Sequence, residues 1–236
     1  FNTLQRVVLP TDKDPEALAL YIDAETWGEV DGRPVRLTDE NRIDDVLGRQ
    51  KFRVRAGKRV SFGTYFNAFP AGYWQRWTSI PSVRLSIKTS GRGEILIYRS
   101  NALGVAAHID SATVSGKGET TTFDLPIDAF IDGGWYWFDL VAGKNDLTLE
   151  SADYATDHAP NRTGKATVAI TTFNRPEYCV EVIRALNSEA ALATVVDAVM
   201  VIDQGTKLVS DQKAYPAIAK KYGPRLKHIR QPNLGG

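Results

Sequence analysis

The side chains best suited to binding a ligand gather in three short clusters in the last third of the sequence. They are TTFNR at 171–175, DQGT at 203–206 and PNLGG at 232–236. Each cluster combines hydroxyl, amide, charged or glycine residues and directly follows an apolar run. Such a combination is typical of a site for a polar, phosphorylated ligand.

Several members of the clusters suit separate parts of a nucleoside diphosphate. Phe173 can stack on a base, and Arg175 can pair with a phosphate. Gln204 offers both a donor and an acceptor, which match the N–H and C=O edge of uracil. Asn233 precedes a pair of glycines that let backbone approach a ribose or phosphate closely. The predicted site consists of Thr172, Phe173, Arg175, Asp203, Gln204 and Asn233.

Each of these residues also has a purely structural interpretation. Thr172 and Asn174 could cap the helix that follows them. Phe173 could belong to the core, and Arg175 could be a solvated surface charge. Asp203 could anchor its own loop and make no ligand contact. It is the occurrence of three clusters after three successive apolar runs that favours a binding site.

Composition and missing motifs exclude several other classes. There is no G-x-G-x-x-G or G-x-x-x-x-G-K-[ST] pattern, which argues against a dinucleotide oxidoreductase and a P-loop NTPase. The single cysteine excludes an internal disulfide framework and a multi-cysteine zinc site. A net charge of +1 offers no global basic field, so we expect no nucleic-acid partner.

The segments that must position the clusters alternate between two periods. Strands buried on both faces, as in a parallel sheet, are predicted at 166–173, which is nearly continuously apolar and β-branched, and at 198–203. A third strand is predicted at 226–231. Helices are predicted between them, over 174–187 and 210–222. This order is the opening of a Rossmann-like sheet, whose strand ends meet at one edge where ligands bind.

The first helix has one apolar face. Cys179, Val182, Ile183 and Leu186 follow the i, i+3, i+4, i+7 spacing. Cys179 is therefore interpreted as a small core residue, with a reactive thiol as the less favoured alternative. Pro176 suits the first helical turn.

The first two thirds of the chain follow the period of short strands separated by turns. VRLSIKT, from Val83 to Thr89, alternates strictly between apolar and polar residues. Further strands are predicted at 93–100, 104–112, 119–127, 135–142 and 147–154, with upstream additions at 51–56 and 59–66 and others near 4–10 and 17–22. We therefore predict an α and β, multidomain chain: a jelly-roll-like antiparallel β-sandwich over 1–155, a linker over 156–165 and an incomplete nucleotide-binding domain over 166–236. The linker contains an Asn161-Arg162-Thr163 sequon, which we interpret as part of an exposed loop and not as a glycosylation site.

Aromatic residues crowd into YFNAFPAGYWQRW, at 65–77. Tyr73, Trp74, Arg76 and Trp77 could form a glycan platform, since aromatic faces stack on the C–H surfaces of sugars. They could equally fill the sandwich core or dock it against another domain or subunit, and we favour this second interpretation. Trp135 and Trp137 lie two apart on one predicted strand, so they are expected to face the same side.

Together these segments resemble a known enzyme family. VAITTFNRPEYCVEVIRAL, VMVIDQGT and IRQPNLGG are similar to the nucleotide-binding segment of inverting GT-A glycosyltransferases. The upstream GGWYWFDLVAG and LESADY resemble the N-terminal domain of the galactofuranosyltransferases that polymerise mycobacterial cell-wall galactan. The resemblance implies that the six site residues bind UDP, and that Gln204 replaces a commoner acidic residue.

The resemblance further implies transfer of galactofuranose from UDP-galactofuranose to a growing galactan with inversion. In the family an acidic motif binds Mn²⁺ or Mg²⁺, and a later carboxylate acts as general base. Both are expected C-terminal to residue 236, so residues 1–236 are expected to hold no catalytic or metal-binding group and to be inactive alone. The resemblance also implies a lipid-linked acceptor, a homo-oligomer and a peripheral position at the inner face of the plasma membrane.

Two other functions stay open on the sequence. The chain could be a non-catalytic carbohydrate-binding or assembly module, or a GT-A transferase that uses another UDP-sugar or a CTP-derived donor. The N-terminus has no signal-peptide pattern. The most apolar stretch of the chain, 190–202, is too short to span a bilayer. A cytoplasmic location is therefore expected.

Overall fold

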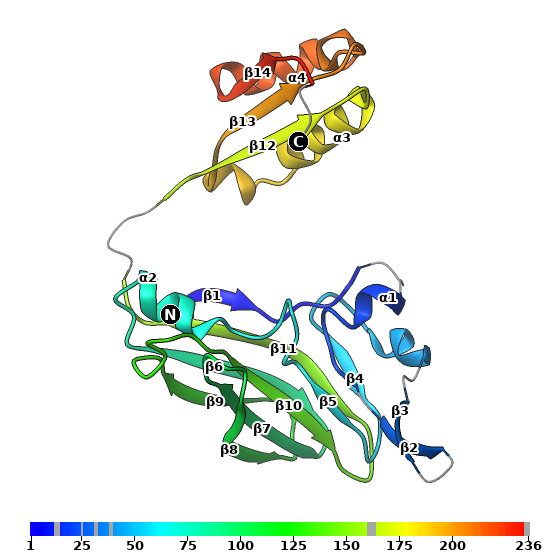
Figure 1. The fold of residues 1–236 in the computed structure, drawn as a ribbon, viewed down its shortest axis with the longest axis vertical. Coiled ribbons are helices and arrows are strands. Elements are labelled where there is room, and N and C mark those ends of the chain that lie inside the picture. Colours follow the sequence, from blue (N-terminus) through cyan, green and yellow to red (C-terminus); the bar gives the residue numbers. More distant parts are fainter. Residues whose placement is uncertain (12–14, 25, 31–32, 38–39, 160–163, 234–236) are drawn as a thin grey trace. The chain divides into compact units, whose positions relative to one another are not determined.

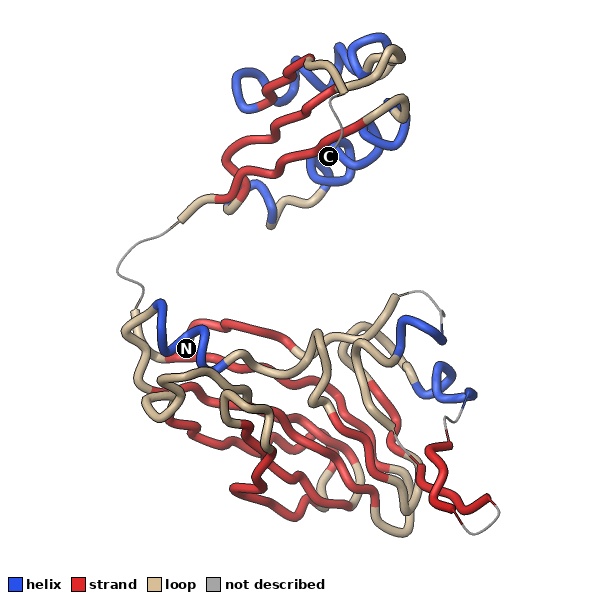
Figure 2. The backbone as a smooth tube through the Cα atoms, viewed as in Figure 1, coloured by secondary structure: helices blue, strands red, loops and turns tan. Residues whose placement is uncertain are grey.

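The computed structural model describes residues 1–11, 15–24, 26–30, 33–37, 40–159 and 164–233. The chain divides into two compact units, Phe1–Ala159 and Pro160–Gly236 (Figure 1). The sequon at 161–163 and the glycine pair at 235–236 lie outside the described residues. Figure 2 shows the contrast in composition: the first unit is mostly strand and loop, while the second alternates strand and helix.

The first unit is a β-sandwich built from two antiparallel sheets. One sheet has the order β1-β11-β6-β9, with β4 also pairing with β11, and the other has the order β5-β10-β7-β8. The bounds of the first sheet are β1 Asn2–Arg6, β4 Phe52–Val54, β6 Ser82–Ser90, β9 Lys117–Pro126 and β11 Leu147–Thr156. Those of the second are β5 Arg59–Ser61, β7 Gly93–Ser100, β8 Ala106–Val114 and β10 Tyr136–Ala142. The first and last strands, β1 and β11, pair in one sheet, and most consecutive strands alternate between the two sheets, with β7 and β8 as a hairpin within one sheet. This arrangement is like that of a jelly roll.

The core of this unit lies between the two sheets. The predicted alternation of β6 is confirmed, because Val83, Leu85 and Ile87 are all buried. Phe138 and Leu140 face them from β10 and are fully buried. The sandwich is thus held by the inward half of each strand, as expected when two sheets pack face to face.

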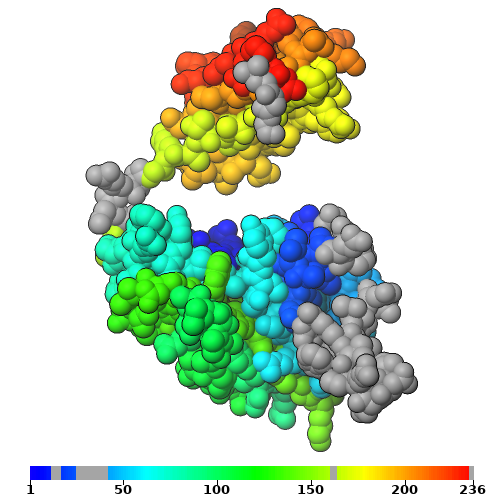
Figure 3. Space-filling model, in the orientation of Figure 1, coloured from blue at the N-terminus to red at the C-terminus, as the bar shows by residue number. Residues whose placement is uncertain are grey.

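Short elements cover the sandwich. They are helix α1 (Pro15–Leu18), the hairpin of β2 (Thr26–Val30) and β3 (Arg33–Leu37), a 3-10 turn at Glu40–Asp45 and helix α2 (Ala71–Trp77). In the space-filling view, residues far apart in sequence share the surface of this unit (Figure 3). Asn67 is one link, because its side chain bonds the backbone of Val8 and Tyr21.

Two predicted strands of the first unit are wrong. Residues 17–22 begin in α1 and continue as a turn, with Ile22 N–H donating to Leu18 O. The strand predicted over 59–66 ends at Ser61. Beyond it the chain is held by Thr64, whose hydroxyl donates to Tyr21 O over 2.8 Å, so a tertiary contact replaces the strand pairing.

The second unit has the predicted strand–helix–strand–helix–strand order. Its parallel sheet has the order β12-β13-β14, and its elements are β12 Ala166–Thr172, α3 Pro176–Ser188, β13 Val196–Asp203, α4 Tyr215–Tyr222 and β14 Leu226–Arg230. Further 3-10 turns lie at Leu192–Thr194, Val209–Asp211 and Gly223–Arg225. The second helix begins at Tyr215, not at 210, because Pro216 fits only within the first helical turn.

The helices of this unit pack on one face of the sheet. Strands in sequential order with right-handed crossovers place both helices on the same side. Cys179 and Ile183 of α3 meet Val199 and Val201 of β13 there. The expectation that β12 is buried on both faces is therefore wrong for this chain, since Thr167, Ala169 and Thr171 are exposed.

The apolar face of α3 also differs by one residue from the prediction. Val182 is 46% exposed, while Val180 is buried. Cys179 is buried, as predicted. Burial, followed by the nearby charge of Asp203, raises the pKa of the Cys179 thiol to about 11, so the thiol is protonated and unreactive at neutral pH.

Candidate functional site

The ends of the three parallel strands meet at one edge of the second unit. Thr172 is the register partner of Asp203, and Asp203 is the register partner of Arg230. The alignment continues past the strands, because Gln204 N–H donates to Thr172 O and Gln231 N–H donates to Asp203 O, each over 3.0 Å. The first two predicted clusters are therefore adjacent, and the third begins next to them.

Asn174 ties the first cluster to the second. Its backbone has a φ of 52°, in the left-handed region, and its Oδ1 accepts hydrogen bonds from Thr206 N at 2.8 Å and Lys207 N at 2.9 Å. A Cβ on Gly205 would lie 2.6 Å from both Asn174 N and Asn174 Oδ1, so this approach requires glycine. The loops after β12 and β13 are therefore clamped together.

The capping interpretation of Thr172 and Asn174 is wrong. The N-cap of α3 is Arg175, and no side chain caps it. The Thr172 hydroxyl donates to Arg175 O at 3.4 Å. This bond stabilises the turn before α3, and the hydroxyl does not accept a hydrogen bond from the helix N–H groups. Asn174 was missed as a site residue because its partners, Thr206 and Lys207, lie more than 30 positions away along the chain.

Asp203 anchors its own loop. It is fully buried, and its Oδ1 accepts from Gly205 N at 3.3 Å and its Oδ2 from Val209 N at 2.8 Å. His228 of β14 places Nε2 3.2 Å from the same Oδ2. The structure thus favours the loop-anchoring alternative, with His228 as a partner that no local pattern in the sequence indicated.

Other predicted site residues present their side chains to solvent. Phe173 is 53% exposed, which rules out the core interpretation. Arg175 is exposed, and its guanidinium lies 5.8 Å from the centroid of the Tyr178 ring, which is itself exposed. Gln204 is half-buried and Asn233 is exposed. An exposed aromatic ring, a cation and amide groups are therefore available along this edge.

The described residues of this edge do not form a metal site. Among the described residues, no group of three or more His, Cys, Asp or Glu side chains could hold a metal ion. Asp203, the carboxylate at the edge, directs its oxygens to Gly205, Val209 and His228. These residues consequently do not fit a divalent cation.

The aromatic segment on α2 divides into a buried and an exposed part. Trp74 packs against the sandwich core and stacks on Phe69 with ring centroids 6.1 Å apart, as the core interpretation requires. Tyr73 and Trp77 are 60% and 66% exposed, and the Arg76 guanidinium lies 5.2 Å from the Trp77 ring centroid. One of the four residues is thus structural and three lie on the surface.

Trp135 and Trp137 do not share a strand. β10 begins at Tyr136, so Trp135 precedes it, and its side chain is 45% exposed. Trp137 is half-buried and stacks on Tyr98 of β7 with centroids 5.6 Å apart. Gly63 packs so close to the Trp137 ring that a Cβ would lie 2.8 Å from it.

Within the described residues, no helix is long and apolar enough to cross a membrane.

Comparison with known proteins gives related sequences for the whole chain. The chain is 36% identical over 239 residues to galactofuranosyltransferase GlfT2 of Mycolicibacterium smegmatis and 37% identical over 240 residues to that of Mycobacterium tuberculosis. All of this chain is covered in both cases, but only 35% and 36% of the relatives, so the chain spans about a third of their length.

Solved structures and a family model were compared in the same way. A carbohydrate-binding module of family 29 aligns with 64% of this chain and 86% of its own, with 14% identity and a TM-score of 0.31. The family model described as galactofuranosyltransferase 2 N-terminal matches residues 4–157, which is more than half of the chain and takes in the sandwich. The chain therefore belongs to the galactofuranosyltransferase 2 N-terminal family.

Proposed function

We propose that the chain is the donor-binding part of an inverting GT-A glycosyltransferase that transfers galactofuranose from UDP-galactofuranose to a growing cell-wall galactan. The names of the relatives along the whole chain support this function. The observation that carries it is the alignment of the β12, β13 and β14 ends, in which Gln204 bonds to Thr172, the residue that precedes Phe173.

Each exposed group at the edge has a role in this proposal. Phe173 stacks on the uracil ring, and the Gln204 amide pairs with the N–H and C=O edge of the base. Arg175 is the cation among the six site residues and pairs with the diphosphate. Asn233 contacts the ribose or a phosphate. Thr172 and Asp203 hold the two loops in place.

The transfer chemistry itself is not assigned to residues of this chain. The buried carboxylate of Asp203 is committed to its loop and cannot take a proton from an acceptor hydroxyl. The Mn²⁺ or Mg²⁺ ligands and the general base are proposed to belong to other segments of the whole protein, as are the lipid-linked acceptor, the homo-oligomer and the peripheral membrane contact. This chain on its own is expected to bind UDP without transferring sugar.

A binding titration with UDP tests the proposal. Phe173→Ala removes the stacking ring and Arg175→Ala removes the phosphate partner, so each is expected to weaken UDP binding by about 1–3 kcal/mol. The measurement is the Kd from isothermal titration calorimetry with the 236-residue chain. Cytidine diphosphate, in competition, separates uridine recognition by Gln204 from general nucleotide binding.

Arg184→Ala is the matched control, because Arg184 is an exposed arginine on α3 away from the strand ends. Its Kd is expected to equal that of the unchanged chain. Equal UDP affinity in the Phe173→Ala, Arg175→Ala and Arg184→Ala variants would refute the proposed donor site. Displacement of UDP by the cytidine nucleotide at equal concentration would remove the uridine assignment.

A further inference from the structure

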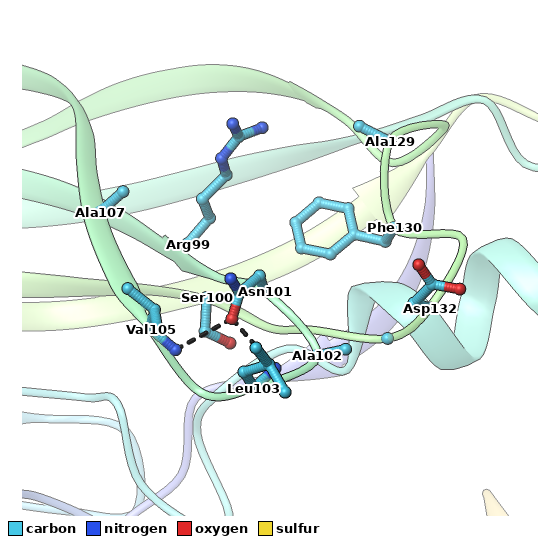
Figure 4. Close-up of a pocket in the computed structure, with 11 residues that line it drawn as sticks. Arg99, Ser100, Asn101, Ala102, Leu103, Val105, Ala107, Ala129, Phe130 and Asp132 are labelled. Atoms are coloured by element: carbon cyan, nitrogen blue, oxygen red, sulfur yellow. Dashed lines mark hydrogen bonds between the residues drawn. The ribbon is translucent and has the colours of Figure 1, made fainter.

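A cavity of about 450 Å³ opens in the sandwich unit, beside the loop that joins β7 to β8. Its lining includes Arg99 at the end of β7, Val105 and Ala107 at the start of β8, and Phe130 and Asp132 from the loop before β10. Figure 4 shows the Arg99 and Phe130 side chains extending toward the space between these segments. The volume falls within the range of about 300–1,000 Å³ that is typical of small-molecule sites.

The loop on one side of the cavity is held by its own hydrogen bonds. Asn101 Oδ1 accepts from Leu103 N and Val105 N, each at 3.0 Å, as the dashed lines in Figure 4 show. Gly104, with a φ of 78°, supplies the left-handed residue that this tight loop requires. The wall formed by Leu103 and Val105 is therefore ordered without a ligand.

On the opposite side, Ser100 at the end of β7 holds the segment that precedes β10. The Ser100 hydroxyl accepts from Trp135 N at 3.2 Å, and Ser100 N–H donates to Trp135 O at 2.9 Å. Gly134, with a φ of 127°, would place a Cβ 2.4 Å from Ser100 O, so the backbone passes too close for any side chain. Trp135, which is 45% exposed, is thereby held next to a residue that lines the cavity.

Two charged side chains at the cavity make no hydrogen bond or ion pair within the described part of the chain. They are Arg99, whose backbone pairs with its neighbouring strands, and Asp132, and both are exposed. Their charges cancel, so the lining favours a neutral ligand over an anion or a cation. A guanidinium donates up to five hydrogen bonds and a carboxylate only accepts, which together suit the hydroxyl groups of a polyol.

Apart from Ser100 and Asn101, the remaining lining is apolar. Leu103 and Val105 are 88% and 62% exposed, and Phe130 packs edge-on against Tyr136 at the buried side. A ligand that matches these walls needs C–H surfaces as well as hydroxyl groups. Sugar rings combine both, and the partly exposed Trp135, whose backbone bonds the lining residue Ser100, offers a flat face for a neighbouring ring.

We infer that this cavity binds a sugar residue of a neutral oligosaccharide, with Arg99 and Asp132 bonding its hydroxyls and Trp135 stacking on an adjacent ring. The cavity belongs to the sandwich and lies outside the strand-end edge assigned to UDP. Only the identity of the oligosaccharide rests on the proposed function: for a galactan-forming transferase it is the galactofuranose polymer.

A saccharide titration with the 236-residue chain tests the inference. The probes are a galactofuranose oligosaccharide of about six residues and inorganic phosphate. We expect the oligosaccharide to bind, and Arg99→Ala and Asp132→Ala each to raise its Kd at least 10-fold. Ala129→Trp, which fills the cavity from an exposed lining position, is expected to abolish binding. Arg184→Ala is the control, and thermal denaturation checks that each variant is folded.

Absence of saccharide binding, or an unchanged Kd in folded Arg99→Ala and Ala129→Trp variants, would overturn the inference. Displacement of the oligosaccharide by inorganic phosphate would overturn the preference for a neutral ligand. UDP affinity is measured in the same samples. Saccharide binding that persists without UDP binding would uphold the cavity while refuting the proposed donor site, so the two failures are distinguishable.

Discussion

Asp203 is a buried carboxylate that fixes the loop at the end of β13. Its two oxygens accept backbone N–H groups from Gly205 and Val209. His228 approaches the same side chain from the neighbouring strand. The loop that carries Gln204 is therefore set by Asp203, and the position of the amide depends on it.

Asp203→Asn is expected to destabilise the second unit. An amide presents one oxygen where the carboxylate presents two, so one buried N–H group loses its acceptor at a cost of about 1–3 kcal/mol. Urea denaturation monitored by circular dichroism measures the change. Asp197→Asn is the control, because Asp197 is an exposed aspartate of the same strand. Equal losses in the two variants would contradict the anchoring role.

Cys179 makes the stability of the second unit depend on alkaline pH. Its folded-state pKa is raised to about 11, mainly by burial, above the ordinary value of 9.0. The unfolded chain therefore loses this proton at lower pH than the folded chain. The contribution is fully present below about pH 9 and is lost as the pH rises through the folded pKa.

Cys179→Ala is consequently expected to flatten the fall in stability between about pH 9 and pH 11, by up to about 3 kcal/mol. The measurement is the difference in unfolding free energy between the two proteins at each pH, which cancels the other titrating groups. Parallel pH profiles for Cys179→Ala and the unchanged chain would show that the buried thiol does not couple to folding.

Helix α2 is an element whose position is set by a glycine. Gly72 N–H donates to Gly134 O at 3.0 Å, and a Cβ on Gly72 would lie 2.5 Å from the Gly133 Cα. The helix therefore packs backbone against backbone on the loop that also lines the sandwich cavity. This contact keeps Trp74 against the core and Tyr73 and Trp77 at the surface.

Gly72→Ala is expected to lower the stability of the sandwich by about 1–3 kcal/mol, since neither backbone segment can yield without breaking its pairing. Gly48→Ala is the matched control, because a Cβ there meets its nearest neighbour at 3.8 Å. Thermal denaturation of both variants measures the effect. A Gly72→Ala transition as high as that of Gly48→Ala would refute the close packing of α2.

At the scale of elements, the sequence predicts what depends on short-range periodicity. The alternation through Val83, Leu85 and Ile87 gave a strand with the correct face buried. Prediction failed where distant partners decide. Residues 17–22 look like a strand, but their backbone turns to meet Ser61 through Asp23 and Thr64 through Tyr21.

The candidate site shows the same division. Convergence of the strand ends follows from topology alone, so the proximity of Thr172, Phe173 and Gln204 could be predicted from the sequence. The clamp by Asn174 and the contact of His228 with Asp203 could not, because each joins residues 25 or more positions apart through side-chain geometry. The exposed face of β12 was missed because apolar content does not show which face the helices cover.

At the scale of the whole molecule, the chain combines two units with different chemistry. The sandwich has a cavity lined by Arg99, Asp132 and apolar side chains, and the parallel sheet has an edge with an aromatic ring, a guanidinium and amides. A polymerising transferase needs both a donor site and a binding site for its growing product. The proposed functions of the two units therefore support each other while resting on separate residues.

The proposed donor site places UDP at the strand-end edge of the second unit. Nitrogen-15 NMR of the labelled 236-residue chain, titrated with UDP, detects binding there residue by residue. We expect chemical-shift changes concentrated at the backbone amides of Phe173, Arg175, Gln204 and Asn233, with the amide signals of the sandwich core unchanged. Saturating UDP that moves none of these four amide signals, or that moves only signals of the sandwich, would refute the proposed site.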